Sequence, residues 1–427
     1  MKRRLSFLLI FALILTACLL FIPSCGYRSR ELKYGDYRYT VENDEVTITQ
    51  YTGNDAEVTV PGSIKGMPVV AIDSSAFHHC DNMRSVTIPD SVVRIGCLAF
   101  SKCYALEHVT LGRGIRESDF SPFSFCEIMI YNKYKNGYYV GNEENPYLAL
   151  VSMASEDAET VTIHPDTVVV CGSAMEGCSS LRELFVSDAV VSIGSVAFSY
   201  CSSLETLYIP ESVESIGHMA FQHCDSLLNI VVSDKSPHFK SVDGILFSHD
   251  GTRLIKYAAA QIVSSYRIPN GVLIIEDYAF ENAKQLTEVV LSDSVEEIGH
   301  SAFIHCENLR NIQLGNSLKR IGGQAFGFCS SLTAITIPDS VEELSYSVFS
   351  YCDNLESAVI GSGVTCMDYD NFRGCTSLRE VIFKNTKGWV VSTQFGLYRS
   401  KVDVSDPEKN VEYLTDKYCA YYWYRFK

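Results

Sequence analysis

The sequence predicts an elongated, β-rich repeat solenoid, because a 23-residue period runs along it and the same apolar pattern recurs within each period. A chain of 427 residues is long enough for two or three globular domains, or for one domain whose core grows by repetition. Repetition at this spacing is typical of one solenoid coil. The period is marked by cysteines that lie 23 residues apart in three groups: Cys80, Cys103 and Cys126; Cys178, Cys201 and Cys224; Cys306, Cys329, Cys352 and Cys375.

Each unit follows the consensus Leu-x-x-Val-x-Ile-Pro-x-Ser-Val-x-x-Ile-Gly-x-x-Ala-Phe-x-x-Cys-x-x-Leu, of which residues 204–227 are one copy. The Val-x-Ile alternation predicts a short strand with two apolar side chains inward and one outward, and the proline ends it. The Val-x-x-Ile-Gly segment predicts a second inward pair, followed by a turn in which the glycine takes a positive φ. The near-helical spacing of Ala, Phe, Cys and Leu predicts a short helix or 3₁₀ turn that closes the coil.

The repeated cysteines are predicted to form a buried column of structural thiols. Stacked coils align equivalent residues, and buried cysteine behaves as a small apolar side chain, which fits its replacement by Ala283 in one unit. Zinc is disfavoured because no CxxC pair or histidine at ligand spacing accompanies the cysteines. Disulfides are the alternative in an exported chain. Cys97, Cys171, Cys366 and Cys419 lie outside the column, and the last two are the best candidates for pairing.

These units resemble the BspA-type, or Treponema-pallidum-type, leucine-rich repeats, a 23-residue class found on bacterial surface proteins. The resemblance extends over about residues 36 to 385. It implies a curved right-handed leucine-rich-repeat superhelix, with a parallel sheet on one face and short helical or 3₁₀ turns on the other side. It also implies adhesion to host matrix proteins, other bacteria or epithelial cells. No particular ligand is implied, because a repeat consensus encodes packing.

The repeat is interrupted twice, and a β-hairpin insert is predicted at each place. The cysteine spacing rises to 52 residues after Cys126 and to 82 residues after Cys224. Asn136-Gly137 and Asp250-Gly251 lie between apolar runs and are typical hairpin turns. Both ends of a solenoid need caps, because uncapped ends would expose the core and the edges of strands. We therefore expect an N-terminal cap with a first repeat at 36–79, a solenoid at 80–385 with inserts near 127–160 and 233–262, and a C-terminal cap at 386–427.

The first residues follow the pattern of an export signal. Three basic residues precede an apolar stretch from Leu5 to Ile22, after which the chain becomes polar. The segment that ends at Cys25 resembles a lipobox, which predicts a signal peptide over 1–24 and a lipidated anchor and linker over 25–35. Lipidation at Cys18 is an alternative, as is an uncleaved membrane anchor, because about 18 apolar residues just cross a bilayer. Each interpretation predicts an exported protein whose repeats lie at the bacterial cell surface.

Charge and motifs disfavour several functional classes. The formal net charge of -16, from 35 Lys+Arg and 51 Asp+Glu, repels phosphate backbones and disfavours nucleic acid as a partner. The sequence carries no nucleotide-binding, zinc-protease or serine-hydrolase motif. His78 and His79 beside Cys80 resemble a base with a nucleophile, but that cysteine belongs to the core-facing column. The Asp368–Asp370 segment lacks the further ligands of a calcium loop. We predict no enzyme, no cofactor and no metal site.

The variable positions of the repeat offer surface for a ligand. The outward residue of each Val-x-Ile strand falls in one column, where Phe185, Tyr208 and Val231 are neighbours. An exposed apolar strip of this kind is a typical contact site. Aromatic and β-branched residues, however, also suit strands in general. The second candidate is the tyrosine-rich first insert, since loops on a rigid scaffold often carry binding. Its candidate residues are Tyr131, Tyr134, Tyr138 and Tyr139.

These observations predict a cell-surface protein that binds protein or glycan ligands through its strand face and its inserts. The expected partners lie on a host cell, in the matrix or on neighbouring bacteria, and an N-terminal lipid would hold the protein at the membrane. The alternative is a structural role as an envelope spacer or assembly component without an external ligand. The sequence leaves the ligand and the oligomeric state open.

Overall fold

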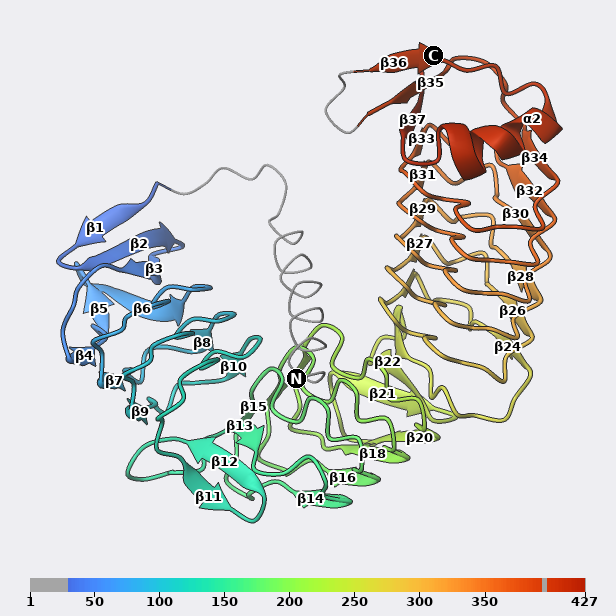
Figure 1. Ribbon diagram of the computed structural model, residues 1–427. Helices are drawn as coiled ribbons and strands as arrows, with labels where there is room; N and C mark the ends of the chain where they lie inside the picture. Colours follow the sequence, from blue (N-terminus) through green and yellow to red (C-terminus); the bar gives the residue numbers. More distant parts are fainter. Residues whose placement is uncertain (1–29, 394–397, 427) are drawn as a thin grey trace.

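The computed structural model describes residues 30–393 and 398–426, which form an arc of stacked coils (Figure 1). The predicted fold class is confirmed: coils of about 23 residues stack through parallel sheets, and two hairpins are inserted between them. The predicted signal peptide and both candidate lipidation sites, Cys18 and Cys25, lie outside the described residues. Within the described ranges, no helix is long and apolar enough to cross a membrane.

Each coil contributes two short strands, one from the Val-x-Ile segment and one at the place of the Val-x-x-Ile-Gly segment. The first strands are β4 (Glu57–Thr59), β7 (Ser85–Thr87), β9 (His108–Thr110), β14 (Thr160–Thr162), β16 (Glu183–Phe185), β18 (Thr206–Ile209), β20 (Asn229–Val232), β24 (Ser265–Arg267), β26 (Glu288–Val290), β28 (Asn311–Gln313), β30 (Ala334–Thr336), β32 (Ser357–Ile360) and β34 (Glu380–Phe383). The second strands are β6 (Met67–Ile72), β8 (Arg94–Ile95), β10 (Glu117–Ser118), β13 (Ala149–Met153), β15 (Val169–Val170), β17 (Ser192–Ile193), β19 (Ser215–Ile216), β23 (Arg253–Lys256), β25 (Ile274–Ile275), β27 (Glu297–Ile298), β29 (Arg320–Ile321), β31 (Glu343–Leu344) and β33 (Cys366–Met367).

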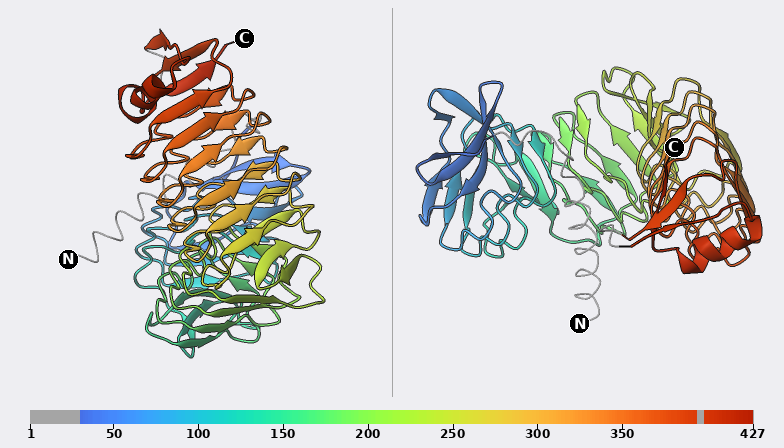
Figure 2. Two further views of the ribbon diagram at one scale, coloured as in Figure 1. Left: turned by 90° about the vertical axis from the view of Figure 1, so that its right-hand side faces the viewer. Right: turned by 90° about the horizontal axis from the view of Figure 1, so that it is seen from above.

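The two sets of strands lie on opposite sides of the arc. The first strands follow its outer contour and the second strands its inner contour (Figure 1). Figure 2 shows the coils stacked along the arc from two further directions. Neighbouring strands pair in parallel with a 23-residue offset, so that Leu184 lies opposite Leu207 and Ile193 opposite Ile216. The outward residues of the first strands therefore form a column on the outer surface.

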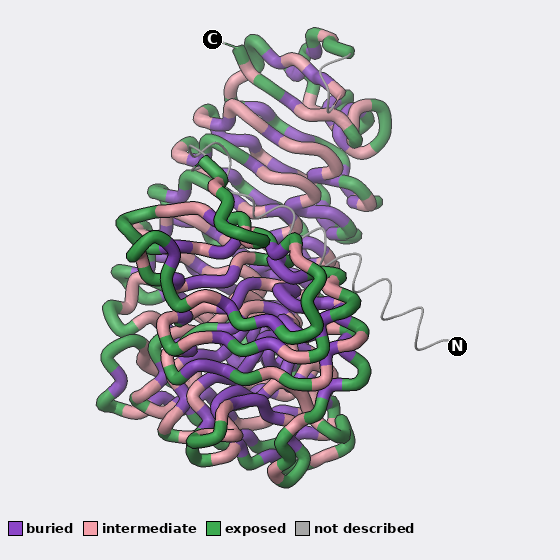
Figure 3. Tube along the Cα trace, turned by 90° about the vertical axis from the view of Figure 1, so that its left-hand side faces the viewer, coloured by how far each residue is buried: buried purple, intermediate pink, exposed green. Residues whose placement is uncertain are grey.

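A column of phenylalanine rings fills the interior of the coils. From Phe280 to Phe372 the rings of successive coils stack with centroid separations between 4.6 and 5.5 Å. These rings are fully buried, and burial continues along the inside of the coils in Figure 3. Burying a phenylalanine side chain contributes roughly 1.5–3 kcal/mol, so the repeated phenylalanine stabilises every coil against its neighbours.

The cysteine column is a hydrogen-bonded feature as well as an apolar one. The Sγ of Cys103 donates to the carbonyl oxygen of Phe77 at 3.0 Å, in the preceding coil. Seven further column cysteines donate in the same way. The predicted candidates for pairing were wrong: Cys366 lies in β33 and Cys419 in a turn of the C-terminal cap, and neither forms a disulfide.

The repeated glycine has a role other than the predicted one. Gly96 and Gly217 do not take a positive φ. A Cβ at Gly217 would lie 2.3 Å from the backbone nitrogen of Ser195, and a Cβ at Gly96 would lie 2.6 Å from that of Ser74. The glycine is therefore required by the close approach of consecutive coils, which no side chain permits.

The closing turn is a chain of hydrogen-bonded turns rather than a continuous helix. The N–H of Cys329 donates to Phe326 O at 3.3 Å, which is the i→i−3 bond of a 3₁₀ turn. The left-handed residues Gln324 (φ 56°) and Phe328 (φ 59°) interrupt the turn before it becomes a helix. Left-handed residues at the same two places recur along the solenoid, for example at Val196 and Tyr200.

The two inserts divide the molecule into three parts with separate hydrophobic cores. The first insert is the antiparallel hairpin of β11 (Asn132–Tyr134) and β12 (Gly137–Val140). The second contains β21 (Phe239–Val242) and β22 (Ile245–Ser248), which pair antiparallel around residues 243–244, and β22 also pairs antiparallel with β23 around the predicted turn Asp250–Gly251. Each hairpin begins a new sheet on the inner contour. We call the parts the N-terminal arm, the middle segment and the C-terminal arm. The first junction lies between β10 and β15, and the second junction between β19 and β23.

Both ends of the stack are covered. At the N-terminus, β1 (Leu32–Tyr34), β2 (Tyr37–Glu42) and β3 (Glu45–Tyr51) form an antiparallel sheet that continues into β6, and β5 (Ser63–Ile64) pairs with β6. At the C-terminus, β37 (Tyr422–Arg425) pairs antiparallel with β33 and with β35 (Trp389–Ser392), and β36 (Arg399–Lys401) pairs with β35. The helix α2 (Pro407–Glu412) lies against β34, and the π-helical turn η1 (Tyr413–Lys417) follows it directly (Figure 1). These elements protect the core and strand edges that a solenoid would otherwise expose.

Candidate ligand-binding surfaces

The predicted strand-face strip lies on β16, β18 and β20 of the middle segment. The parallel register places Phe185 opposite Tyr208 and Tyr208 opposite Val231. The rings of Phe185 and Tyr208 stack with centroids 4.6 Å apart and an interplanar angle of 8°. Their exposed fractions are 52% and 38%, and Val231 is half-buried. The structure therefore brings the three residues together as one strip on the outer surface.

The strip is held rigidly from beneath and from the side. Leu184, Leu207 and Ile230 alternate with its residues and point into the core, where they are buried. On the surface beside it, Arg182 donates to the carboxylate of Glu205 at 2.7 Å. The strip is therefore an apolar platform with a charged rim, which is the anatomy of a protein contact surface.

The rest of the outward column does not continue this platform. Val290, the next apolar residue of the column, is only 9% exposed, and Gln313 and Thr336 are polar. Val359 and Ile382 lie in register on the C-terminal arm, but they carry no aromatic ring. The stacked aromatic pair is thus confined to the middle segment, at the base of the arc (Figure 1).

The tyrosines of the first insert mostly pack against the coil. Tyr139 is 1% exposed, and its hydroxyl accepts a hydrogen bond from the His164 N–H at 3.2 Å, so its ring offers no surface to a ligand. Tyr131 and Tyr138 pack on each other with centroids 5.2 Å apart, and Tyr134 contacts the His164 ring at 4.6 Å. These three rings are half-buried. Burial raises the pKa of Tyr131 to about 12.

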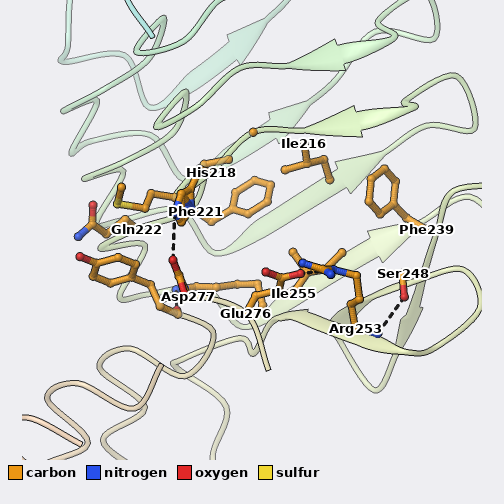
Figure 4. Close-up of a pocket in the computed structure, with 15 residues that line it drawn as sticks. Ile216, His218, Phe221, Gln222, Phe239, Ser248, Arg253, Ile255, Glu276 and Asp277 are labelled. Carbon is orange, nitrogen blue, oxygen red and sulfur yellow. Dashed lines mark hydrogen bonds and ion pairs between the residues drawn. The ribbon is translucent and has the colours of Figure 1, made fainter. Parts of the chain in front are cut away.

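A cleft at the second junction was not predicted. It has a volume of about 350 Å³ and lies where β19 faces β23 without pairing (Figure 4). His218 points across it, with Nε2 3.0 Å from Oδ2 of Asp277. Arg253 forms an ion pair with Glu276 on the opposite wall. His218 and Asp277 therefore pair across the junction, whereas Arg253 and Glu276 pair along its C-terminal side.

A buried network continues from this cleft into the C-terminal arm. Asp277 accepts a hydrogen bond from the His300 N–H at 2.5 Å, and the ring of His300 lies 3.1 Å from the Ser301 hydroxyl and 3.4 Å from that of Tyr346. Burial raises the pKa of Asp277, while the nearby His218 lowers it in part. Burial lowers the pKa of His300 to about 4. The network joins two segments of the solenoid, and it presents no nucleophile.

The histidine and cysteine combination at residues 78–80 has the wrong chemistry for a nucleophile. A hydrogen bond with Cys103 and burial both raise the pKa of the Cys80 thiol far above its ordinary range, which keeps it protonated. His78 Nδ1 lies 2.6 Å from the Ser101 hydroxyl rather than beside the thiol. Among the described residues, no group of three or more His, Cys, Asp or Glu side chains lies close enough to hold a metal ion.

One feature of the sequence could have indicated that clefts lie at the two junctions. The cysteine spacing is irregular only at the two inserts, and a cleft lies beside each insert. The cleft at the first junction lies between residues 120–125 and 173–177. The cleft at the second junction lies between residues 216–222 and 276–278. Sequence periodicity locates such breaks, but it cannot say whether an insert fills the gap between coils.

Comparison with known proteins agrees with this architecture. The family model described as "BspA type Leucine rich repeat region (6 copies)" matches residues 69–143, 153–253 and 256–387. A leucine-rich cell surface protein from Faecalibacterium prausnitzii A2-165 is 28% identical, with a TM-score of 0.53 over 84% of this chain and 96% of that chain. The pneumococcal vaccine antigen PcpA is 24% identical, with a TM-score of 0.49 over 84% of this chain and 88% of that chain. Among curated proteins, none matches.

Proposed function

Because the chain belongs to the BspA-type leucine-rich repeat family, we propose that it is an exported cell-surface protein that binds a protein or glycan ligand through the outer strand face of its middle segment. The family is one of leucine-rich repeats, and the similar Faecalibacterium protein is described as a leucine-rich cell surface protein. A binding role requires an exposed, preorganised contact site, and the Phe185–Tyr208 pair meets that requirement.

The exposed stack of Phe185 on Tyr208 is the observation that carries this proposal. Two aromatic rings at 52% and 38% exposure, side by side on a rigid sheet, leave apolar surface in water with no counterpart in the coils on either side. Aromatic side chains bury large areas at low entropic cost when a partner covers them, and they also stack on the apolar faces of sugars. The half-exposed Tyr134 and Tyr138 of the first insert would extend the contact, whereas the buried Tyr139 would not.

Anchoring at the membrane is a further part of the proposal. The similar Faecalibacterium protein is described as a cell surface protein, and the lipobox-like segment ending at Cys25 would supply a diacylglycerol anchor. Cys18 is the alternative position. Labelling of cells with a palmitate analogue distinguishes them: Cys25→Ala removes the label if Cys25 is lipidated, and Cys18→Ala removes it if the earlier site is used.

A binding panel tests the ligand proposal. Purified residues 31–427 are applied to immobilised matrix proteins, mucins, a glycan array and whole bacterial cells, with wild type beside Phe185→Ser/Tyr208→Ser. Circular dichroism checks that both proteins fold. We expect saturable binding to at least one panel member by the wild type, and loss of that binding in the double variant. Binding to no panel member would instead favour the role of an envelope spacer without external ligand.

A further inference from the structure

Backbone hydrogen bonds join the closing turns of successive coils into a ladder. The N–H of Phe100 donates to the carbonyl oxygen of Pro122 at 2.8 Å, and the N–H of Met175 donates to that of Ala197 at 2.8 Å. Every coil of a regular stack thus presents turn donors to the next coil, as a strand does at the edge of a sheet. The ladder is the reason that one closing turn lies flat on the next.

This ladder is interrupted at the first junction and resumes in the middle segment. The last bond before the interruption runs from the N–H of Ser121 to the carbonyl oxygen of Gly172 at 3.2 Å. Within residues 30–393 and 398–426, the N–H of Phe123 finds no acceptor, and the carbonyl oxygens of Ala174 and Glu176 receive no donor. These groups occupy the positions at which regular coils bond. The turns at 121–126 and 173–178 therefore open away from each other as a wedge, with backbone donors on one wall and acceptors on the other.

The wedge encloses a cleft of about 520 Å³ with aromatic and acidic walls. Its aromatic residues include Phe120, Phe125 and Tyr131, and Phe125 is 47% exposed. Glu156 and Glu176 also line it, and no lysine or arginine is found among the described residues of its lining. Burial raises the pKa of Glu176, while the Ser173 side chain lowers it in part. A cationic group entering the cleft would meet both a carboxylate and ring faces.

The second junction is bridged by side chains rather than by the turn ladder. The buried carboxylate of Glu281 accepts the N–H of His223 at 2.8 Å, and Oδ2 of Asp277 lies 3.0 Å from Nε2 of His218. The inserted segment only continues the ladder within the C-terminal arm, where the N–H of Tyr257 donates to Ala279 O at 2.8 Å. At the first junction, Glu176 occupies the same place in its coil as Glu281. No ion pair among the described residues includes this carboxylate, which therefore remains available to a cation from outside.

We propose that the cleft at the first junction binds an extended segment of a partner protein, whose backbone continues the turn ladder and whose arginine or lysine side chain pairs with Glu176 against the rings of Phe125 and Tyr131. This inference rests on the proposed role in protein binding and assigns that role a second, separate site. The acidic lining and the chain's net charge of -16 select a basic segment. The unmet backbone groups select an extended one, as in the addition of a strand to a sheet edge.

The test uses a fluorescein-labelled heptapeptide that alternates valine with arginine, and the same peptide with citrulline in place of arginine. Citrulline keeps the shape of the side chain and removes its charge. We expect the arginine peptide to bind residues 31–427 saturably in fluorescence anisotropy. We expect the citrulline peptide, and the variants Glu176→Gln and Phe125→Ser, to bind about tenfold more weakly or worse, since each loses a charge-assisted or cation–π contact.

A matched control keeps the test specific. Phe328 occupies the same place in its coil as Phe125 and lies in an unbroken part of the C-terminal arm, between His305 and Tyr351. Phe328→Ser should leave peptide binding unchanged, and so should Phe185→Ser/Tyr208→Ser on the outer face. Equal binding of the citrulline peptide, unchanged binding by Glu176→Gln, or no binding of the arginine peptide at millimolar concentration would overturn the proposal. Strand-face binding in the panel is measured independently, so failure of one site is distinguishable from failure of the other.

Discussion

The thiol of Cys329 donates a hydrogen bond to the carbonyl oxygen of Phe303 at 3.2 Å, one coil earlier in the stack. The same oxygen also accepts the N–H of Cys306 at 3.2 Å, so it is satisfied twice in a fully buried place. Burial raises the pKa of Cys329 well above its ordinary range and keeps the thiol protonated as a donor. Cysteine is thus favoured at this position over valine or alanine because it fills the column and ties two coils together.

Replacement of Cys329 by alanine tests this role. The variant loses the thiol hydrogen bond and leaves a small cavity, which should lower the free energy of unfolding by ~1–2 kcal/mol. Urea denaturation followed by circular dichroism measures the change. Cys366→Ala is the control, because Cys366 lies outside the column and is half-buried. An equal loss in both variants would show that the column adds nothing beyond ordinary packing.

Replacement of Gly217 by alanine should be far more damaging than the residue change suggests. The new Cβ would lie 2.3 Å from the backbone nitrogen of Ser195, and backbone cannot move aside as a side chain can. We expect a loss of several kcal/mol or failure to fold. Gly271→Ala provides the comparison: it has φ +96° but nothing within 4 Å of a new Cβ, so it should cost only the left-handed strain of about 1–2 kcal/mol. Thermal unfolding of the two variants ranks them.

The glycine also illustrates how far the sequence specified the fold. The 23-residue period of the sequence predicted the coil, the two strands and the inward residues, because each follows from side-chain alternation. Turn residues at the breaks in the period predicted the two hairpins. The reason why glycine is required at this position was predicted wrongly. A positive φ and a close approach of two coils both require glycine, so the sequence alone does not distinguish them. The left-handed residues, such as Val196, carry no sequence mark at all.

The stability of the protein should fall when the pH is lowered from about 6.5 to about 4 because of His300. Burial lowers the pKa of this imidazole from 6.5 to about 4 in the folded protein. In that window the unfolded chain binds a proton that the folded protein does not, so unfolding is favoured as the pH falls. The contribution is at most about 3 kcal/mol. Urea denaturation at several pH values measures it against His300→Gln, which cannot titrate. Parallel curves for the two proteins would contradict the assignment.

The buried charges at the second junction predict a non-additive mutant cycle. Glu281 is 2% exposed, and its carboxylate lies 3.2 Å from Nδ1 of His223 and 3.9 Å from Nζ of Lys256, which is 4% exposed. Glu281→Leu leaves the lysine buried without its counter-charge and should cost about 3–5 kcal/mol. Lys256→Met in the same chain should restore part of that loss. Additive losses in the double variant, measured by urea denaturation, would show that the two charges do not interact.

The junctions mark the limit of prediction for the candidate sites. Register alone placed Phe185, Tyr208 and Val231 side by side, because residues at one position of a repeat align in a parallel sheet. Tyr139 was misjudged as a contact residue because alternation within a hairpin does not say which face packs on the coil. The pairing of His218 with Asp277 joins residues 59 positions apart, across an insert whose path follows no repeat.

The most direct test of the strand-face proposal is the dissociation constant of whichever ligand the binding panel yields, measured for two double variants. Phe185→Ser/Tyr208→Ser removes the stacked rings, and Val359→Ser/Ile382→Ser makes the matching change at in-register positions of the same column on the C-terminal arm. We predict that the first variant weakens binding by about tenfold or more and that the second leaves it within about twofold. Equal effects of the two variants, or unchanged binding in the first, would contradict the account.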